Sequence, residues 1–574
     1  MSFLRARRRD LLFWAVIVVA VAVHLPALTA PFMLDDHAQI AMAEGRFGAP
    51  RGPLDLYDYL DDANRSSLFD RGVIPWWTDP RLVVCFLRPL PSALVWTDHL
   101  LFGARAVWPH VHSLLWWALG TLGVAVLLRR SFGLRAGLLG TLVFALAPCH
   151  AIPLVWIANR EALVSTALGV WALVAYERWR EEHRPRDGAA SLLLFALATL
   201  AGEYTLGFVG YAVAIELTVR RQTIARRALG VLAFVVPVAA YLAVHLALGY
   251  DARGTGFYRN PLHDIGTYAS GAPRRLAILV GSAWLGADDT WTLSSPWQLA
   301  CLGVASFATL AFLLLYVVRA LPDAQRRRAR WMLLGSVLAI APVLSVEASA
   351  RLLGVSMIGV SGVVGVVLDR VWFPEVPAPR RGVAELAGLV ALYLAFAHFV
   401  RAPLDTLAIF RVSTAPARAY VSRVAWLRQH LDPARSTVMV LRGNSSETLL
   451  WGPLLLGDRA PARWRVLSFA SGRSLLLRTG PRTMDLVQSD RPLFNVGPDD
   501  LFRGAGSLGP GTSVELPGMK ATVDQVDDQS LPKRLTFELD RDLDDPSVQW
   551  ISEDVDGFRE ETIPPVGYGA PVLP

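Results

Sequence analysis

Long apolar stretches alternate with short polar segments over roughly the first 400 residues of the chain. A helix of about 20 residues crosses the hydrocarbon core of a bilayer, and most of these stretches approach that length. The pattern therefore predicts about eleven transmembrane helices. They lie at residues 11–29, 106–128, 135–149, 161–176, 188–202, 205–219, 228–248, 297–318, 331–346, 352–369 and 382–400.

Two further apolar stretches, 82–103 and 275–293, are interrupted by prolines, a glycine and a pair of aspartates. Because proline and glycine break helices, we expect interfacial or re-entrant helices there rather than full crossings. With that assignment every arginine cluster falls on one side of the membrane, which the positive-inside rule makes the cytoplasmic side. The clusters are Arg5, Arg7, Arg8 and Arg9; Arg129 and Arg130; Arg178, Arg180, Arg184 and Arg186; Arg220, Arg221, Arg226 and Arg227; Arg319, Arg326, Arg327, Arg328 and Arg330; and Arg370, Arg380 and Arg381.

The pattern changes near Ser436, where short β-rich runs such as "STVMVLRG" and "LTFELDRD" are separated by turn residues. Such runs predict the strands of an all-β domain. The fold class we expect is a polytopic α-helical membrane protein with a C-terminal, extracytoplasmic all-β domain. Its parts are a transmembrane domain at 1–401 with outer loops 30–105 and 249–296, a linker helix at 402–435, and the β-rich domain at 436–574.

Composition agrees with this assignment. Of 574 residues, 53% are hydrophobic and 18% are charged, and the mean hydropathy is +0.38. The net charge of +7 resides largely in the arginine clusters between spans, so it indicates topology and not a nucleic-acid partner. Three widely spaced cysteines give neither a disulfide framework nor a zinc pattern. Arginine-rich, lysine-poor usage suggests a high-GC bacterium, and hence its inner membrane, with the N-terminus in the cytoplasm.

Two adjacent carboxylates, Asp35 and Asp36, follow the first span in "PFMLDDHAQI". One of them can cap the short helix predicted next, which is the structural interpretation. The pair can also supply a general base or hold a divalent cation. Asp35 and Asp36 are therefore the candidate catalytic residues, and no other metal ligands are assigned.

Further polar residues gather at the predicted outer ends of spans, where charges are expensive and functional roles are common. An outward arginine can hold a lipid-borne phosphate, although a helix-end ion pair explains each residue singly. Glu347 and Arg351, four residues apart, are such a candidate pair. The candidate donor-phosphate or substrate-binding residues are Arg88, Arg160, Glu161, Glu203, Arg351, Tyr258, Arg259 and His263.

These segments together resemble the GT-C superfamily of integral-membrane glycosyltransferases, and most closely its protein O-mannosyltransferase-type branch. The resemblance rests on the acidic pair after span one, "RPLPSALVWTDHLLFGARAVWPHVHSLL", "CHAIPLVWIANREALVSTALG", "GEYTLGF" and "SARLLGVSMIG". It covers about the first 400 residues. This chain has Gly202 where that family usually has a lysine before the glutamate, and the β-rich tail replaces the tetratricopeptide repeats of some members.

The resemblance implies a transferase that moves a hexose from a polyprenyl-phosphate donor to an extracytoplasmic glycan, lipid or protein acceptor. Asp35 or Asp36 would be the general base, and the reaction would invert the anomeric centre through an oxocarbenium-like transition state. Arg160 and Arg351 would stabilise the departing phosphate. The scheme requires no metal or other cofactor.

Two alternatives stay open at this point. A carrier or flippase for lipid-linked sugars would be expected to show internal repeats and polar residues at mid-span, and neither is visible. A degenerate family member could instead act through its outer β domain as a binding or assembly module.

Overall fold

The computed structural model describes residues 15, 18–218, 223–261, 263–374, 381–469, 472–490, 493–494, 501–503, 508–528 and 530–573. The chain forms two compact units. The helical unit comprises Met1–Pro31, Leu87–Gly249 and Asn260–Ser413. The sheet unit comprises Phe32–Phe86, Tyr250–Arg259 and Thr414–Pro574.

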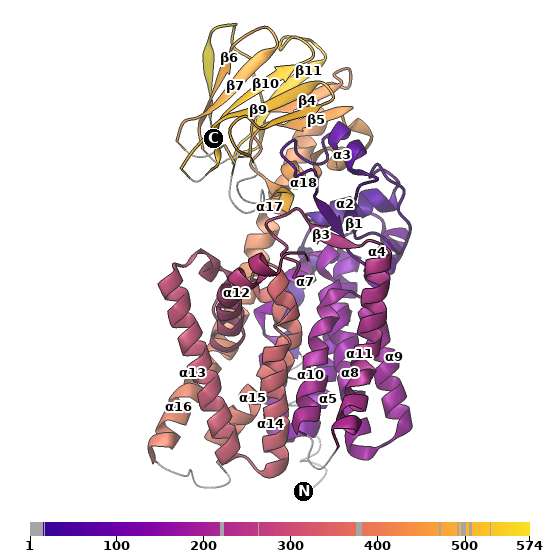
Figure 1. Cartoon of the computed structure of the whole chain (residues 1–574), viewed down its shortest axis with the longest axis vertical. Coiled ribbons are helices and arrows are strands. Elements are labelled where there is room, and N and C mark those ends of the chain that lie inside the picture. The colour runs from indigo at the N-terminus through magenta and orange to yellow at the C-terminus, as the bar shows by residue number, and fades with distance from the viewer. Residues whose placement is uncertain are drawn as a thin grey trace. The chain divides into compact units, whose positions relative to one another are not determined.

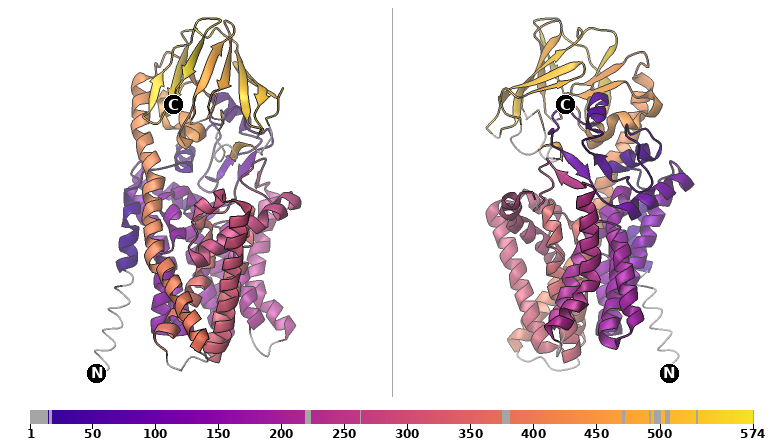
Figure 2. Two further views of the ribbon diagram at one scale, coloured as in Figure 1. Left: turned by 90° about the vertical axis from the view of Figure 1, so that its left-hand side faces the viewer. Right: turned by 45° about the vertical axis from the view of Figure 1, so that its right-hand side comes forward.

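The helical unit is built from long helices that run side by side in all three views (Figures 1 and 2). Its α-helices are α4 (Pro89–Phe102), α5 (Val107–Phe132), α6 (Leu134–Ala145), α7 (Ala151–Val155), α8 (Glu161–Glu182), α9 (Pro185–Thr199), α10 (Gly207–Thr218), α11 (Ile224–Ala247), α12 (Ile265–Leu285), α13 (Pro296–Ala320), α14 (Asp323–Leu338), α15 (Gly354–Trp372), α16 (Arg381–Ala395) and the first part of α17 (Ala402–His430).

The chain is a multi-pass membrane protein. Among the described residues, six helices are long and apolar enough to cross a membrane, or seven if the bent pair Leu134–Ala145 and Pro148–Val155 is one span. Helices α8, α9 and α10 occupy three further predicted spans. The predicted total of eleven stays a prediction, because residues 11–14, 16 and 17 of span 11–29 lie outside the described residues and the apolar helix Val18–Thr29 is shorter than a full span.

Helix α15 is the central element of this unit. Of the most apolar stretch within Ala350–Trp372, which contains α15, 94% is buried inside the protein. Small residues on α15 let the backbones of neighbouring helices approach it closely. A Cβ atom on Gly365 would lie 2.5 Å from the backbone nitrogen of Gly140 on α6. Gly365 therefore lets α15 pack closely against α6 at Gly140, and this contact fixes where the two helices cross.

Ion pairs tie the predicted cytoplasmic arginine clusters together at one end of the helical unit. Arg130 at the end of α5 lies 3.4 Å from Glu182, and Arg328 on α14 lies 3.3 Å from Glu177. Arg328 also donates a 2.7 Å hydrogen bond to the Arg130 carbonyl. The last turns of α5 and α8 and the first turns of α14, with their arginines, therefore share one end of the helical unit, hereafter the arginine end. Residues 5–9, Arg220, Arg221 and Arg380 lie outside the described residues.

The sheet unit contains three β-sheets, as Figure 1 shows for most of their strands. The first has the order β1-β2-β3, the second β13-β6-β7-β10-β9-β8 and the third β12-β11-β4-β5. The strands are β1 (Asp58–Leu60), β2 (Val83–Cys85), β3 (Asp251–Arg253), β4 (Thr437–Val440), β5 (Arg463–Val466), β6 (Ser474–Arg478), β7 (Thr483–Gln488), β8 (Ser513–Leu516), β9 (Met519–Val526), β10 (Pro532–Leu539), β11 (Val548–Glu553), β12 (Phe558–Glu560) and β13 (Gly569–Val572).

The predicted combination of apolar helices with a C-terminal β-sheet region is confirmed. The six-stranded sheet is antiparallel throughout, whereas β4 pairs in parallel with both β5 and β11. Helix α18 (Ser446–Leu455) connects the parallel strands β4 and β5, as a parallel crossover requires. It packs against α2 (Asp35–Ala43), so the loop after the first span folds together with the C-terminal region.

Candidate functional site

Three predicted site residues meet at the end of the helical unit opposite the arginine end. The Arg88 guanidinium, just before α4, lies 3.3 Å from Glu161 Oε1 and 3.2 Å from Glu203 Oε2. The Asn159 side chain donates a 2.8 Å hydrogen bond to the same Glu161 oxygen. Glu161 starts α8 and Glu203 lies just before α10, so one cation joins three segments that are distant in sequence.

Gly202 makes room for this arginine. Its φ of +112° suits glycine, and a Cβ atom there would lie 2.8 Å from Cγ of Arg88. Arg88 therefore supplies a positive charge beside Glu203. The Tyr241 hydroxyl of α11 lies 2.9 Å from Glu203 Oε1 and holds the other carboxylate oxygen.

Arg351 lines a cavity of about 400 Å3 in the same unit. Its guanidinium stacks on the ring of Trp156, 5.5 Å from the centroid, and its charge also acts on Glu161. The remaining lining is largely apolar, with a few carboxylates. It consists of Ala147, Pro148, Cys149, Ile152, Ser282, Gly286, Ala287, Asp288, Asp289, Thr290, Ala350, Leu353, Met357, Ala397, His398, Ala402, Asp405, Ala408, Ile409, Val412 and Ser413.

The carboxylates of this cavity are bonded to groups other than the Arg351 guanidinium. Arg401 lies 2.8 Å from Asp288 and 3.3 Å from Asp405. Asp289 accepts hydrogen bonds of 2.7 Å from Ser349 and from the Ala350 backbone.

Glu347, the sequence-based candidate partner of Arg351, pairs instead with Arg274 at 2.9 Å. Among the described residues, Arg351 has no ion pair with a carboxylate at salt-bridge distance. Its positive charge is therefore available to an anion in the cavity.

Arg160 is fully buried and lies among side chains rather than in the cavity. Its guanidinium nitrogens bond to Asp98 at 2.5 Å, to Ser113 at 2.9 Å and to the Pro109 carbonyl at 2.8 Å. A phosphate could reach Arg160 only by displacing these partners. This geometry favours a role in holding α4, α5 and α8 together, and we leave Arg160 out of the phosphate site proposed below.

The two candidate catalytic carboxylates lie in the sheet unit and have different surroundings. Asp36 is 2% exposed, and its Oδ2 accepts a 3.0 Å hydrogen bond from the Met33 backbone nitrogen. Asp35 is partly exposed, and its Oδ1 accepts a 3.2 Å hydrogen bond from Trp451 Nε1 of α18. Trp451 packs near Phe47 and Tyr59, each with ring centroids 6.0 Å away. Asp36 thus stabilises the turn before α2, whereas Asp35 keeps an accessible edge.

The remaining predicted residues belong to the loop between α11 and α12. Tyr258 and Arg259 fall in the sheet unit, where the Tyr258 ring packs 5.5 Å from Phe86. His263 falls in the helical unit and is exposed. Their predicted role as a substrate lid stays a prediction, as does the convergence of the Asp35–Asp36 pair with Arg351.

One group of potential metal ligands occurs among the described residues: Asp58, Asp61 and Cys85. The Arg51 guanidinium lies 3.0 Å from Asp58 and 3.2 Å from Asp61. A cation already neutralises these carboxylates, and burial raises the pKa of the Cys85 thiol, which disfavours the thiolate that a metal needs. The residues therefore fit a partly buried ion-pair cluster better than a metal centre.

No family model and no curated protein matches the chain. Solved structures give distant similarities. ArnT from Cupriavidus metallidurans in the apo state is 15% identical over 78% of this chain and 84% of that chain, with a TM-score of 0.41. Archaeal oligosaccharyltransferase AglB from Archaeoglobus fulgidus is 14% identical over 79% of this chain and 64% of that chain, with a TM-score of 0.41. Arabinofuranosyltransferase AftD from Mycobacteria is 14% identical over 91% of this chain and 41% of that chain, with a TM-score of 0.37.

Proposed function

We propose that the protein is an inverting membrane glycosyltransferase of the GT-C superfamily, related to its protein O-mannosyltransferase-type branch. It transfers a hexose from a polyprenyl-phosphate donor to an extracytoplasmic glycan, lipid or protein acceptor. The observation that carries the proposal is Arg351, a guanidinium without a carboxylate partner among the described residues, in a mainly apolar cavity. Such a cavity suits an amphipathic ligand with one anionic group.

The phosphate and the prenyl chain of the donor would each bind a different part of this cavity. The phosphate would bind Arg351 through charge-assisted hydrogen bonds, while the prenyl chain would follow apolar residues such as Ile409 and Val412 of α17. Trp156 holds the guanidinium in place by stacking, which reduces the ordering entropy of binding. The Arg88–Glu161–Glu203 cluster fixes the neighbouring segments and presents polar groups for the sugar.

Asp35 is the proposed general base. Its carboxylate removes the proton from the acceptor hydroxyl as the acceptor oxygen bonds to the anomeric carbon from the face opposite the phosphate. The bond between the anomeric carbon and the phosphate oxygen breaks, and polyprenyl phosphate leaves with the electron pair. Arg351 stabilises the charge that develops on that oxygen. The step inverts the anomeric centre and requires no metal in this scheme.

Asp36 has a supporting role in this proposal. It is 2% exposed and bonds to the Met33 backbone, so it holds the turn that presents Asp35. The scheme requires Asp35 and Arg351 to act on one donor, and this requirement is part of the proposal.

Binding of polyprenyl phosphate by the full-length, detergent-solubilised protein tests the donor site. Arg351→Gln should weaken binding at least about tenfold, because a charge-assisted hydrogen bond is lost. Arg319→Gln removes one exposed arginine at the end of α13 and should leave binding unchanged. Equal affinities for wild type and Arg351→Gln would refute the donor site.

A further inference from the structure

The turn that carries Arg351 is held at both of its ends by side chains from other segments of the helical unit. This turn, hereafter the Arg351 turn, runs from Ser349 to Gly354, the first residue of α15. At its start, Asp289, which lies between α12 and α13, accepts hydrogen bonds of 2.7 Å from the Ser349 side chain and from the Ala350 backbone. The start of the turn is therefore fixed independently of its end.

At the end of the Arg351 turn, one hydroxyl group bonds to two backbone groups. Tyr204 donates a 3.1 Å hydrogen bond to the carbonyl of Arg351 and accepts a 2.7 Å hydrogen bond from the Gly354 N–H. Because Gly354 is the first residue of α15, the helix itself offers that N–H no partner. Tyr204 supplies the partner, and the same hydroxyl holds the residue whose guanidinium stacks on Trp156.

Tyr204 also connects the Arg351 turn to the cluster around Arg88. It follows directly on Glu203, whose carboxylate lies 3.2 Å from the Arg88 guanidinium. One short segment before α10 therefore contacts both groups of polar residues. A change in the position of this segment would move Arg351 relative to Arg88.

We propose that Tyr204 is a positioning residue, which holds Arg351 in the orientation that binds the phosphate of the lipid-linked donor. The inference rests on the proposed function, because it concerns the same cavity. A long side chain loses conformational entropy when it binds a ligand, and a backbone fixed in advance reduces that loss. The Tyr204 hydroxyl acts on the ligand only through Arg351.

Tyr211 of α10 provides a matched comparison. Its hydroxyl shares a hydrogen bond with the carbonyls of Val355 at 3.0 Å and Ser356 at 3.1 Å, and it accepts a 2.8 Å hydrogen bond from the Gly359 N–H. Both tyrosines therefore bond to backbone donors and acceptors of the same chain segment, but only Tyr204 bonds to Arg351. An effect on the ligand that is confined to Tyr204 reports on Arg351.

A double-mutant cycle on the full-length, detergent-solubilised protein tests the inference, with polyprenyl phosphate as the probe. Tyr204→Phe should weaken binding about fivefold, the cost of ordering one long side chain on binding. In the Arg351→Gln background the same substitution should leave binding unchanged, because the group that Tyr204 positions is gone. Tyr211→Phe should bind as wild type does, although thermal unfolding should show a loss of stability similar to that of Tyr204→Phe.

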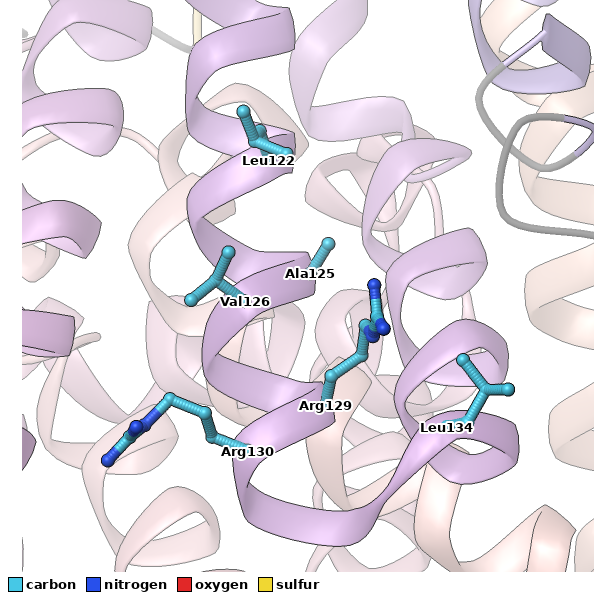
Figure 3. A pocket seen from close by; sticks show the side chains of 6 residues that line it. All are labelled: Leu122, Ala125, Val126, Arg129, Arg130 and Leu134. Carbon is cyan, nitrogen blue, oxygen red and sulfur yellow. The ribbon is translucent and has the colours of Figure 1, made fainter. Parts of the chain in front are cut away.

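A groove of about 380 Å3 at the arginine end also combines arginines with apolar side chains. Figure 3 shows the residues that line it, which are Leu122, Ala125, Val126, Arg129, Arg130 and Leu134. Val126→Trp places a bulky ring in this groove and should leave the affinities of wild type and Tyr204→Phe unchanged. Loss of binding in Val126→Trp would locate the probe in the groove and overturn the inference.

The remaining outcomes separate the role of Tyr204 from the donor site itself. Wild-type affinity in Tyr204→Phe, with binding lost in Arg351→Gln, would overturn the positioning role and leave the donor site intact. An equal loss in Tyr211→Phe, or an equal effect of Tyr204→Phe in both backgrounds, would show that the hydroxyl only stabilises the fold and would also overturn this role. Wild-type affinity in Arg351→Gln would refute the donor site and the positioning role together.

Discussion

Asp35 and Asp36, the two candidate catalytic residues, have different surroundings. They are adjacent in sequence, but one is buried and caps a turn while the other is partly exposed beside an indole N–H. The sequence could predict the pair but not this division of roles. Trp451 is 416 residues away from Asp35, in an apolar stretch without any sequence signal of function.

Substitution of Trp451 should therefore affect transfer without unfolding the protein. Trp451→Phe keeps an aromatic ring but removes the hydrogen bond to Asp35, so we expect transfer to fall roughly tenfold, less than after Asp35→Asn. Glycan products in a deletion strain carrying each variant give the measurement. Trp464→Phe is the control, since the N–H of that buried indole has no hydrogen-bond acceptor among the described residues. An unchanged product level in Trp451→Phe would exclude the positioning role.

Burial of His37 should make the stability of the protein depend on pH. Burial lowers the pKa of His37 from 6.5 to about 4, and the hydrogen bond with the Phe32 backbone opposes this shift. Between pH 6.5 and about 4, His37 is protonated in the unfolded chain but neutral in the folded protein. The free energy of unfolding therefore falls as the pH drops through this window. Thermal unfolding of His37→Gln should show a weaker dependence on pH there. Parallel pH profiles for both proteins would contradict the assignment.

At the scale of elements, sequence periodicity located the apolar helices because each follows from local composition. It did not locate the partners that decide what a polar residue does. Arg160 bonds to Asp98, 62 residues earlier, and β2 pairs with β3, which lies after α11. Such long-range contacts leave no periodic signal, so Arg160 resembled a phosphate ligand in sequence although its guanidinium is internally satisfied.

Substitution of Gly202, which lies between α9 and α10, tests whether Arg88 packs against this turn. Gly202→Ala would place a Cβ atom 2.8 Å from Arg88 at a φ of +112°, and should lower the free energy of unfolding by more than about 1 kcal/mol. Gly133→Ala is the matched control, because Gly133 has a similar backbone conformation, with φ +86° and ψ −174° against φ +112° and ψ −166° at Gly202, but its Cβ atom would meet no atom within 4 Å. The difference between the two variants, measured by thermal unfolding, isolates the displacement of Arg88. Equal losses would mean that Arg88 is not held against Gly202.

For the whole molecule, the positive-inside rule predicts one orientation in the membrane. The arginine end should face the cytoplasm, and the end with Arg88 and Arg351 should face outward. In a Cys301→Ser background, His263→Cys should react with a membrane-impermeant maleimide in intact cells. Arg327→Cys, which is exposed at the arginine end, should react only after permeabilisation. The reverse labelling pattern would show the opposite orientation in the membrane and would contradict the proposed extracytoplasmic reaction.

Glycan analysis of a strain that lacks the gene tests whether Asp35 is required for hexose transfer. Mass spectrometry of surface glycans and glycoproteins should show the loss of one hexose residue in that strain. We expect wild type to restore it fully and Asp36→Asn to restore it in part, because Asp36 supports a turn. Asp35→Asn, present at wild-type levels in the membrane, should not restore it. Full restoration by Asp35→Asn would contradict a role for Asp35 as the general base.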